Sequence, residues 1–219
     1  GEPDVDPHPI ALLGRALEGV EKALYADDRG AGIAHAGAGV LIGATAGRLV
    51  RSSAIATWIA TSGRMLTETA TEIGDALAGG SLEEARRLLP SLVGRDPRGL
   101  DEAEIARAVI ESVAENTVDA VVAPAFWGAI AGAPGALAYR AVNTLDSMVG
   151  HRSERYENFG WASARLDDAA NLIPARLTAA LVVVVRPGRA RQVLHAVRHE
   201  APGHPSPNAG VAEAAKEQQ

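Results

Sequence analysis

The sequence contains no cysteine, and this absence excludes disulfides, thiolate metal sites and a cysteine nucleophile. Lysine is almost as scarce, since Lys22 and Lys216 are the only two. A pyridoxal-phosphate enzyme needs a buried Schiff-base lysine, and a Walker A loop needs a lysine before serine or threonine. We therefore expect no pyridoxal phosphate, and any bound phosphate must be held by arginines, helix N-termini or a metal.

Aromatic residues and clustered positive charge are also missing. Aromatics make up 4% of the 219 residues, whereas alanine and glycine are abundant, a composition that suits closely packed helices better than sheets. The formal net charge is -6 and no basic block is present, so nucleic acid is not an expected partner. The composition predicts an all-α protein.

Several apolar stretches approach the length of a membrane span, which needs about 20 residues. Residues 30–47 carry no charge, and residues 120–139 carry none but are interrupted by Pro124 and Pro134. Residues 177–185 are strongly apolar but short. None of these stretches is a complete span, although several look like pieces of one. The pattern predicts a bundle of apolar, kinked helices, and the alternative to a membrane protein is a soluble bundle in which these helices are buried.

Periodicity and turn signals place the helices. Ser81 with Glu84 and Asp101 with Glu104 are capping-box pairs that predict helix starts. An apolar hairpin bent at the two internal prolines is expected after residue 117. The helices are expected at residues 10–25, 54–77, 82–89, 102–117, 136–149, 161–187 with a kink at Pro174, and 189–199. We expect a single helical domain 1–219, with N-terminal helices in 1–80, a catalytic core in 81–188 and a basic helix with a Pro-rich tail in 189–219.

Three polar clusters are candidates for chemistry, and the first lies on the helix expected at 102–117. Arg107, Glu111 and Glu115 share one face at i, i+4, i+8 spacing, and Asp119 follows. Carboxylates one turn apart suit Mg²⁺, with substrate phosphate completing its shell. The alternative is a solvated face with an Arg–Glu pair.

The second cluster is Arg140, Asn143 and Asp146, beside the apolar stripe of the next helix. Buried polar groups must be paired, so this cluster is either a site or a structural pairing. The third cluster lies on the helix expected from residue 161 and consists of Arg165, Asp167, Asp168, Asn171 and Arg176. Within it Arg165, Asp168 and Asn171 repeat every three residues as a ladder of hydrogen-bonding groups. Half-buried ladders of this kind are functional candidates, and the alternative is a surface salt bridge.

The motifs that contain these clusters resemble one family, the adenosylcobinamide-phosphate synthases of the CobD/CbiB type. The matching strings cover most of the chain in order: Pro7–Pro9, Gly14–Arg15, Gly94–Asp96, Glu111–Thr117, Ala141–Met148, Glu154–Tyr156, Phe159–Ala162, Ala164–Asp168, Asn171, Pro174–Arg176 and His204–Gly210. The resemblance implies a multi-pass protein of the bacterial inner membrane. The chain departs from the family in two places: residues 34–61 are shorter and less hydrophobic than the family's N-terminal spans, and no further apolar helix follows residue 210 in this sequence. Some membrane spans of the multi-pass bundle are therefore expected to be trimmed, and the chain to be partly soluble. An inactive truncated scaffold is one alternative.

The resemblance also implies a reaction in cobalamin biosynthesis. Aminopropanol or its O-phosphate would be joined to a propionate carboxylate of adenosylcobyric acid, with ATP and Mg²⁺ as the expected energy source. The rival is a non-enzymatic corrinoid-binding membrane protein. A homo-oligomer is left open.

Roles for the polar residues follow from the chemistry of an ATP-dependent amide ligase. The assignments are Glu111, Glu115 and Asp119 for the metal; Arg140, Arg155, Arg165, Arg176 and Asn171 for phosphates or the substrate carboxylate; and Asp146, Asp168 and Asn143 for catalysis. The arginine-rich loop 150–160 is expected on the cytoplasmic side. We therefore expect Glu115, Asp146 and Asp168 to meet in one cleft facing the cytoplasm.

Overall fold

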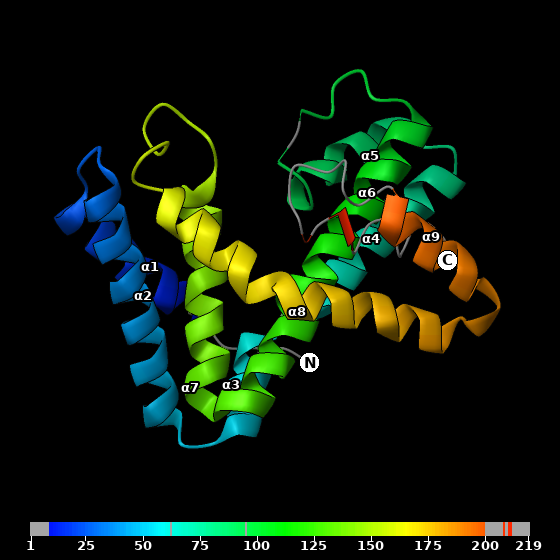
Figure 1. Cartoon of the computed structure of the whole chain (residues 1–219). Coiled ribbons are helices and arrows are strands. Elements are labelled where there is room, and N and C mark those ends of the chain that lie inside the picture. Colours follow the sequence, from blue (N-terminus) through cyan, green and yellow to red (C-terminus); the bar gives the residue numbers. More distant parts are fainter. Residues whose placement is uncertain (1–8, 62, 95, 200–207, 209, 212–219) are drawn as a thin grey trace. The chain divides into compact units, whose positions relative to one another are not determined.

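The computed structural model describes residues 9–61, 63–94, 96–199, 208 and 210–211 (Figure 1). These residues form helices and connecting loops with no strand among them, which confirms the all-α prediction. The chain divides into two compact units, each made of two segments: Gly1–Thr61 with Asp119–Pro174, and Ser62–Val118 with Ala175–Gln219. Their boundaries differ from the three successive segments expected from the sequence. The motif residues Pro7, His8, Arg95, His204–Pro207 and Ala209 lie outside the described residues.

The first unit begins with three helices, α1 (Pro9–Leu24), α2 (Arg29–Val50) and α3 (Ser53–Ala60). The side chain of Asp28 caps α2 by accepting hydrogen bonds from the backbone N–H groups of Gly30 and Ala31. Such caps satisfy backbone donors that have no partner within the helix. At the other end Arg51 adopts a left-handed conformation with φ of 58°, which reverses the chain into α3.

A stripe of small residues lets α2 pack closely against α7 (Ala123–Leu145) (Figure 1). A Cβ atom added at Gly43 would meet the carbonyl oxygen of Leu137 and come within 2.8 Å of the Ala138 Cα. One added at Gly47 would meet the carbonyl oxygen of Ala133. Small residues at this spacing allow helix backbones to approach, as in membrane helix pairs.

The segment after Thr117 forms the expected apolar hairpin, which bends close to Pro134 and not at Pro124. The chain reverses at Gly132, whose φ of 65° and ψ of -154° interrupt α7, so that Gly128 lies against Ala136. Pro124 does not bend the chain, since it occupies the first turn of α7. A proline is tolerated there because the N–H it lacks would have no partner within the helix. The predicted bend at Pro124 is therefore wrong.

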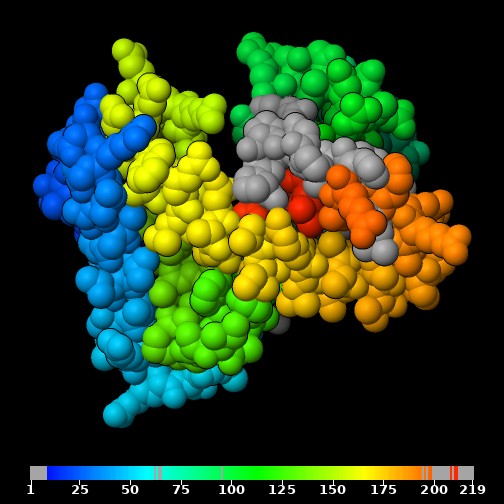
Figure 2. All heavy atoms as spheres, in the orientation of Figure 1, coloured from blue at the N-terminus to red at the C-terminus, as the bar shows by residue number. Residues whose placement is uncertain are grey.

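The loop 151–160 packs on the N-terminal end of α2. The ring of Phe159 stacks on that of His35 with centroids 4.9 Å apart, and the Arg29 guanidinium lies 5.1 Å from the Trp161 ring centre. In Figure 2 the yellow first part of α8 (Trp161–Val185) and this loop lie beside the blue N-terminal helices. The residues of α8 up to Pro174 thereby belong to the first unit.

The second unit contains α4 (Gly63–Ala78), α5 (Leu82–Leu88) with a 3-10 turn (Leu89–Ser91), and α6 (Glu102–Thr117). Their apolar faces form one core around the fully buried Ile73, Leu89 and Ile105. The capping box at Asp101 and Glu104 is present, so the predicted start of α6 is confirmed.

Two local predictions in this part of the chain are wrong. The single helix expected at 54–77 is broken, because Thr61 adopts an extended backbone with ψ of 128° after α3, and α4 starts at Gly63. The helix α5 begins at Leu82 as predicted, but the expected capping box is absent: Ser81 makes no side-chain cap, and Glu84 pairs with Arg87.

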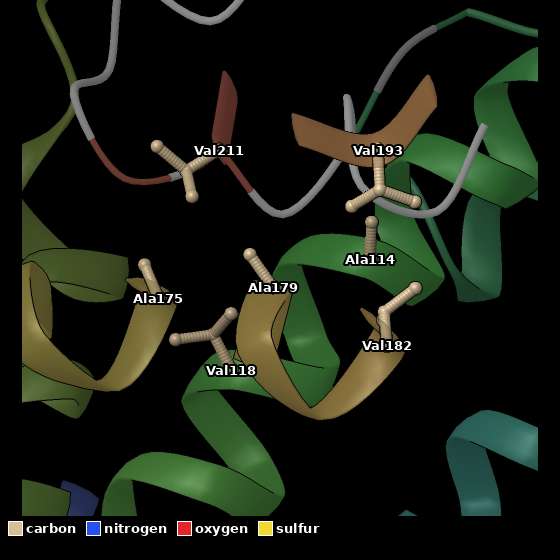
Figure 3. Close-up of a cluster of buried hydrophobic side chains, with 7 residues drawn as sticks. All are labelled: Ala114, Val118, Ala175, Ala179, Val182, Val193 and Val211. Atoms are coloured by element: carbon tan, nitrogen blue, oxygen red, sulfur yellow. The ribbon is translucent and has the colours of Figure 1, made fainter. Parts of the chain in front are cut away.

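A second core in this unit joins α6, the later part of α8 and α9 (Ala190–His199), which follows a 3-10 turn (Pro187–Arg189). Figure 3 shows the small side chains of Ala114, Ala179, Val182, Val193 and Val211 gathered in it. Alanine and valine dominate, which explains how a chain poor in aromatic residues still fills a core.

Three helical stretches are long and apolar enough to cross a membrane: Arg29–Val50, Glu102–Gly150 and Trp161–Val185. Large apolar side chains are exposed on each of them, as the 68% exposure of Leu41, 63% of Ile130 and 74% of Val184 show. Exposed apolar surface on membrane-length helices is what a lipid environment accommodates. The predicted membrane-type helices are thus present.

Candidate functional site

Two carboxylates of the first unit lie in wide turns at the ends of the helical hairpin. Asp119 lies in the π-helical turn Val118–Val122, and Asp146 opens another at Asp146–Gly150. A side chain at Gly150 would collide with the Asp146 carboxyl group, so the absence of one there makes room for that carboxylate. Single π-helical turns inside helices occur frequently at functional sites.

A hydrogen-bond network links the hairpin to the first part of α8. The Asn143 side-chain amide donates to Asp119 Oδ2 at 3.1 Å. The Tyr139 hydroxyl donates to Asn171 Oδ1 at 2.8 Å, and the Asn171 amide donates to Asp167 Oδ2 at 2.9 Å. Tyr139 and Asn171 are 3% and 2% exposed, so this network is buried. We call these five residues the polar core.

The polar core is negatively charged. Asp119 and Asp146 both repel Asp167 electrostatically, and all three carboxyl groups are at least partly buried. The guanidinium of Arg140 contacts this region, since its Nη1 donates to Asn143 Oδ1 at 3.3 Å. Charges interact more strongly where water is excluded, so this arrangement favours a bound cation or proton.

The structure brings several of the residues expected from the sequence into this one region. Asp119, Asn143 and Asn171 belong to the polar core. Arg140 contacts it, and Asp146 acts on the carboxyl group of Asp167. They come from clusters that lie far apart in the sequence, which the hairpin and α8 bring together. Their chemical roles stay predictions.

The expected ladder on α8 is only partly formed. Arg165 pairs with Asp168 at 3.4 Å, on a side where their side chains are 63% and 30% exposed. Asn171 does not continue this ladder, because its amide bonds Asp167 instead. The structure therefore places Asp167 rather than Asp168 in the polar core. The signal for it was the i, i+4 spacing of Asp167 and Asn171, which matches the helical repeat better than a step of three.

Tyr139 is the core residue that the sequence analysis missed, whereas Asp167 belonged to the third cluster without an assigned role. It lies one turn before Asn143, on the same face of α7. Tyrosine was considered only as an aromatic residue, although a buried tyrosine hydroxyl needs a hydrogen-bond partner.

Arg155 is engaged outside the polar core. Its guanidinium lies 3.4 Å from Glu21 Oε1 and 4.5 Å from the Tyr25 ring centre. Tyr156 in the same loop donates its hydroxyl to Glu21 Oε1 at 2.8 Å, and this hydrogen bond raises the pKa of Tyr156. These contacts hold loop 151–160 against the α1–α2 junction, while the Arg155 side chain stays 59% exposed.

The remaining predicted residues belong to the second unit. Glu111 and Glu115 lie on α6, where Glu115 is exposed, and Arg176 is exposed on α8. Their participation in the site stays a prediction, as does a shared cleft for Glu115, Asp146 and Asp168. Within the described part of the chain, no three histidine, aspartate or glutamate side chains are grouped to hold a metal ion. The assignment of Glu111, Glu115 and Asp119 to a metal draws on residues of both units and stays a prediction.

The second unit also has an open, charged hollow of about 350 Å³. Its lining residues are Glu83, Arg86, Arg87, Pro97, Arg98 and Gly99. The arginines there already have partners: Arg87 lowers the pKa of Glu84, and Arg98 lowers the pKa of Asp96, in each case chiefly through a side-chain hydrogen bond. Surface pairs of this kind contribute little to stability, and we assign the hollow no role.

The fold and the polar core together define a class of protein, a helical protein of the membrane type with a buried, acidic polar centre between a hairpin and a neighbouring helix. A sequence model described as CobD/Cbib protein matches residues 1–216. The chain belongs to the CobD/CbiB family, and this membership gives it a role in cobalamin biosynthesis. No solved structure matches it.

Relatives from distant bacteria match most of the chain. The cobalamin biosynthesis protein CobD of Mycobacterium tuberculosis (strain ATCC 25618 / H37Rv) is 52% identical over 221 residues, which cover 95% of this chain and 71% of the relative. The protein of the same name from Geobacter metallireducens is 44% identical over 244 residues, covering 98% of this chain and 74% of the relative. That of Pelobacter propionicus is 41% identical over 245 residues, covering 98% and 72%.

Proposed function

We propose that the protein is an ATP-dependent amide ligase that converts adenosylcobyric acid to adenosylcobinamide or its phosphate. It would attach aminopropanol, or aminopropanol O-phosphate, to a propionate carboxylate of the corrinoid. Family membership supports the pathway. The observation that carries the reaction type is the polar core, because amide formation from an ammonium-bearing substrate needs buried carboxylates next to hydrogen-bonding groups.

The reaction balances in two steps. The propionate carboxylate attacks the γ-phosphorus of ATP, forming an acyl phosphate and releasing ADP. The neutral amine then attacks the acyl carbon, the C–N bond forms, and inorganic phosphate leaves. A base must first remove one proton from the ammonium group, because only the neutral amine is a nucleophile.

Residues of the first unit are assigned to these needs. Asp146 and Asn143 lie at the polar core, where a carboxylate can take the proton and an amide can orient the amine. Arg140 is the guanidinium next to this region and is assigned to the acyl phosphate. The helix α8 supplies further candidates: Asp168 for catalysis, and Arg165 and Asn171 for binding phosphates or the substrate carboxylate.

Nucleotide and metal are proposed as a Mg²⁺–ATP complex that enters as substrate. Mg²⁺ in such complexes is held mainly by phosphate oxygens and water, with one or two carboxylates from the protein. We assign Asp119 of the first unit as a carboxylate ligand of this Mg²⁺. Further candidates for binding the Mg²⁺–ATP complex are Glu111, Glu115, Arg155 and Arg176. No step is assigned to a metal held by the protein alone.

We place the protein in the bacterial inner membrane as a multi-pass protein with its site toward the cytoplasm. The 22 residues of α2 correspond to about 33 Å of helix, enough to cross the hydrocarbon core. Arg29, Arg152 and Arg155 lie at the end of the unit where loop 151–160 packs, and arginine-rich short loops stay cytoplasmic. Adenosylcobyric acid and ATP would reach the site from that side.

The experiment is a product assay with the protein reconstituted in lipid vesicles. Adenosylcobyric acid, Mg²⁺-ATP and either aminopropanol or its O-phosphate are supplied, and ADP and the corrinoid amide are measured together. We expect equal amounts of both, with one of the two amines preferred. Corrinoid binding without ADP or amide formation would reject the ligase and favour a corrinoid-handling membrane protein.

A further inference from the structure

We infer that one face of α8, made by Ser163, Asp167 and Asn171, is the binding subsite for the ammonium group of the amine substrate. The three residues follow each other at i, i+4, i+8 spacing, so they form one stripe on the helix. This stripe meets the hairpin through the hydrogen bond between Asn171 and Tyr139. The inference rests on the proposed function, since it names the place where that reaction holds its amine.

The first supporting observation is unused hydrogen-bonding capacity. Ser163 is only 1% exposed, and its hydroxyl oxygen has no hydrogen-bond partner. Asp167 Oδ1 is likewise buried and unpartnered, although Asp167 Oδ2 accepts from Asn171. Asn143 lies near the same carboxyl group, but not at a distance and angle that give Oδ1 a hydrogen bond. Buried polar atoms without partners are costly and call for an explanation.

The second observation is the sign of the surrounding charge. Asp119 and Asp146 both act on Asp167, and Arg140 is the guanidinium that contacts this region. The carboxyl groups of Asp119 and Asp146 lie close enough to act on Asp167, so a single cation beside Asp167 would be attracted by all three. Such a cation would lie between Ser163 Oγ and Asp167 Oδ1, the two oxygen atoms without hydrogen-bond partners, whose residues are one helical turn apart.

The chemistry of the unpaired atoms selects the kind of cation. The described residues contain no group of three carboxylates or imidazoles arranged to ligate a metal. A primary ammonium carries three donors and no acceptor, so it can donate to Asp167 Oδ1 and to Ser163 Oγ together. Charge-assisted hydrogen bonds of this type are about twice as strong as neutral ones.

The location also suits a small amine. Asp167 lies six residues into α8 and Asn171 ten, which puts them about 9 to 15 Å along the helix from the loop end. An amine with a short carbon chain can reach this depth, whereas the corrinoid is far larger and would remain toward the loop. The subsite would thereby hold the amine nitrogen on the side of the reaction centre that lies away from loop 151–160.

The test compares three variants of the full chain in lipid vesicles. Asp167→Asn removes the charge while keeping the shape, Ser163→Ala removes one acceptor, and Glu157→Gln removes a charge from the exposed part of loop 151–160 as the matched control. Loss of a charged hydrogen bond predicts a rise of about 10- to 100-fold in KM for the amine in Asp167→Asn. Ser163→Ala should raise it by about 2- to 10-fold. KM for adenosylcobyric acid should change less than twofold in all three.

Equilibrium dialysis with radiolabelled aminopropanol alone separates this inference from the ligase reaction. If wild type binds aminopropanol and Asp167→Asn and Ser163→Ala bind it more weakly, the subsite stands even where no amide product forms. If Asp167→Asn does not fold, the Ser163→Ala variant carries the same comparison. Wild-type protein that fails to bind aminopropanol, or variants whose amine KM matches that of Glu157→Gln, would overturn the subsite while leaving the ligase reaction to its own assay.

Discussion

The part of α7 after Gly132 packs closely against α2, and this contact gives a direct test of what stabilises the first unit. Replacing Gly43 by alanine adds a Cβ that would meet the Leu137 carbonyl oxygen and lie 2.9 Å from the Ala141 Cβ. The neighbouring atoms belong mainly to backbone, which cannot rotate away. The two helices must separate, and overpacking of this kind costs about 1–3 kcal/mol.

The same helix supplies a control of opposite sign. Gly37 is exposed on α2, and an added Cβ there would meet nothing within 4 Å. Alanine at an unhindered helix position is favoured over glycine by about 0.5–1 kcal/mol, because glycine loses more backbone entropy on folding. The pair Gly43→Ala and Gly37→Ala thus changes the same residue type on one helix with opposite expected effects.

Thermal unfolding in detergent, followed by circular dichroism, measures the difference. For a protein of 219 residues, 1 kcal/mol corresponds to about 2–4 °C in Tm. Gly43→Ala should therefore lower Tm by about 2–12 °C, and Gly37→Ala should raise it by about 1–4 °C. Equal Tm changes in the two variants would refute the close approach of α2 and α7.

Three further outcomes follow from single contacts. Asp101→Ala should lower the free energy of unfolding by about 1 kcal/mol because Asp101 caps α6, whereas Ser81→Ala should leave it nearly unchanged; urea titration compares them. In Glu21→Ala, spectrophotometric titration should show the pKa of Tyr156 falling toward its ordinary value. In wild type, the hydrogen bond between Tyr156 and Glu21 should stabilise the fold at pH values below the ordinary tyrosine pKa. That stabilisation should disappear as the pH rises through the raised pKa of Tyr156. Asn171→Leu should cost about 1–3 kcal/mol by chemical denaturation, since it leaves two buried partners unsatisfied; a cost near zero would mean that the polar core is hydrated.

Local signals in the sequence were sufficient for most helices. The Asp101 capping box placed the start of α6, and the charged loop before Trp161 placed the start of α8. Because proline breaks helices, the sequence predicts bends at both Pro124 and Pro134, but a proline in the first turn of a helix, such as Pro124, breaks nothing. The reversal instead needed a residue tolerant of positive φ, and Gly132 supplies it.

The site shows where sequence reasoning stops. The clusters around Asn143 and Asn171 were each visible along the chain, but their meeting depends on the hairpin and on the packing of α8. Asp167 and Asp168 are adjacent carboxylates of equal chemistry, and only the rotation of α8 about its axis decides which one faces the buried side. A one-residue difference of this kind turns the side chain by about 100° around the helix, and no composition argument detects it.

The central claim is that this chain forms an amide bond on a corrinoid, and one measurement tests it most directly. Protein reconstituted in vesicles is mixed with adenosylcobyric acid, Mg²⁺-ATP and aminopropanol or aminopropanol O-phosphate, and the products are followed by mass spectrometry. We expect adenosylcobinamide or its phosphate to accumulate in step with ADP, and to depend on all three substrates. Corrinoid that binds to the protein but stays unmodified, with no ADP released by either amine, would contradict the account.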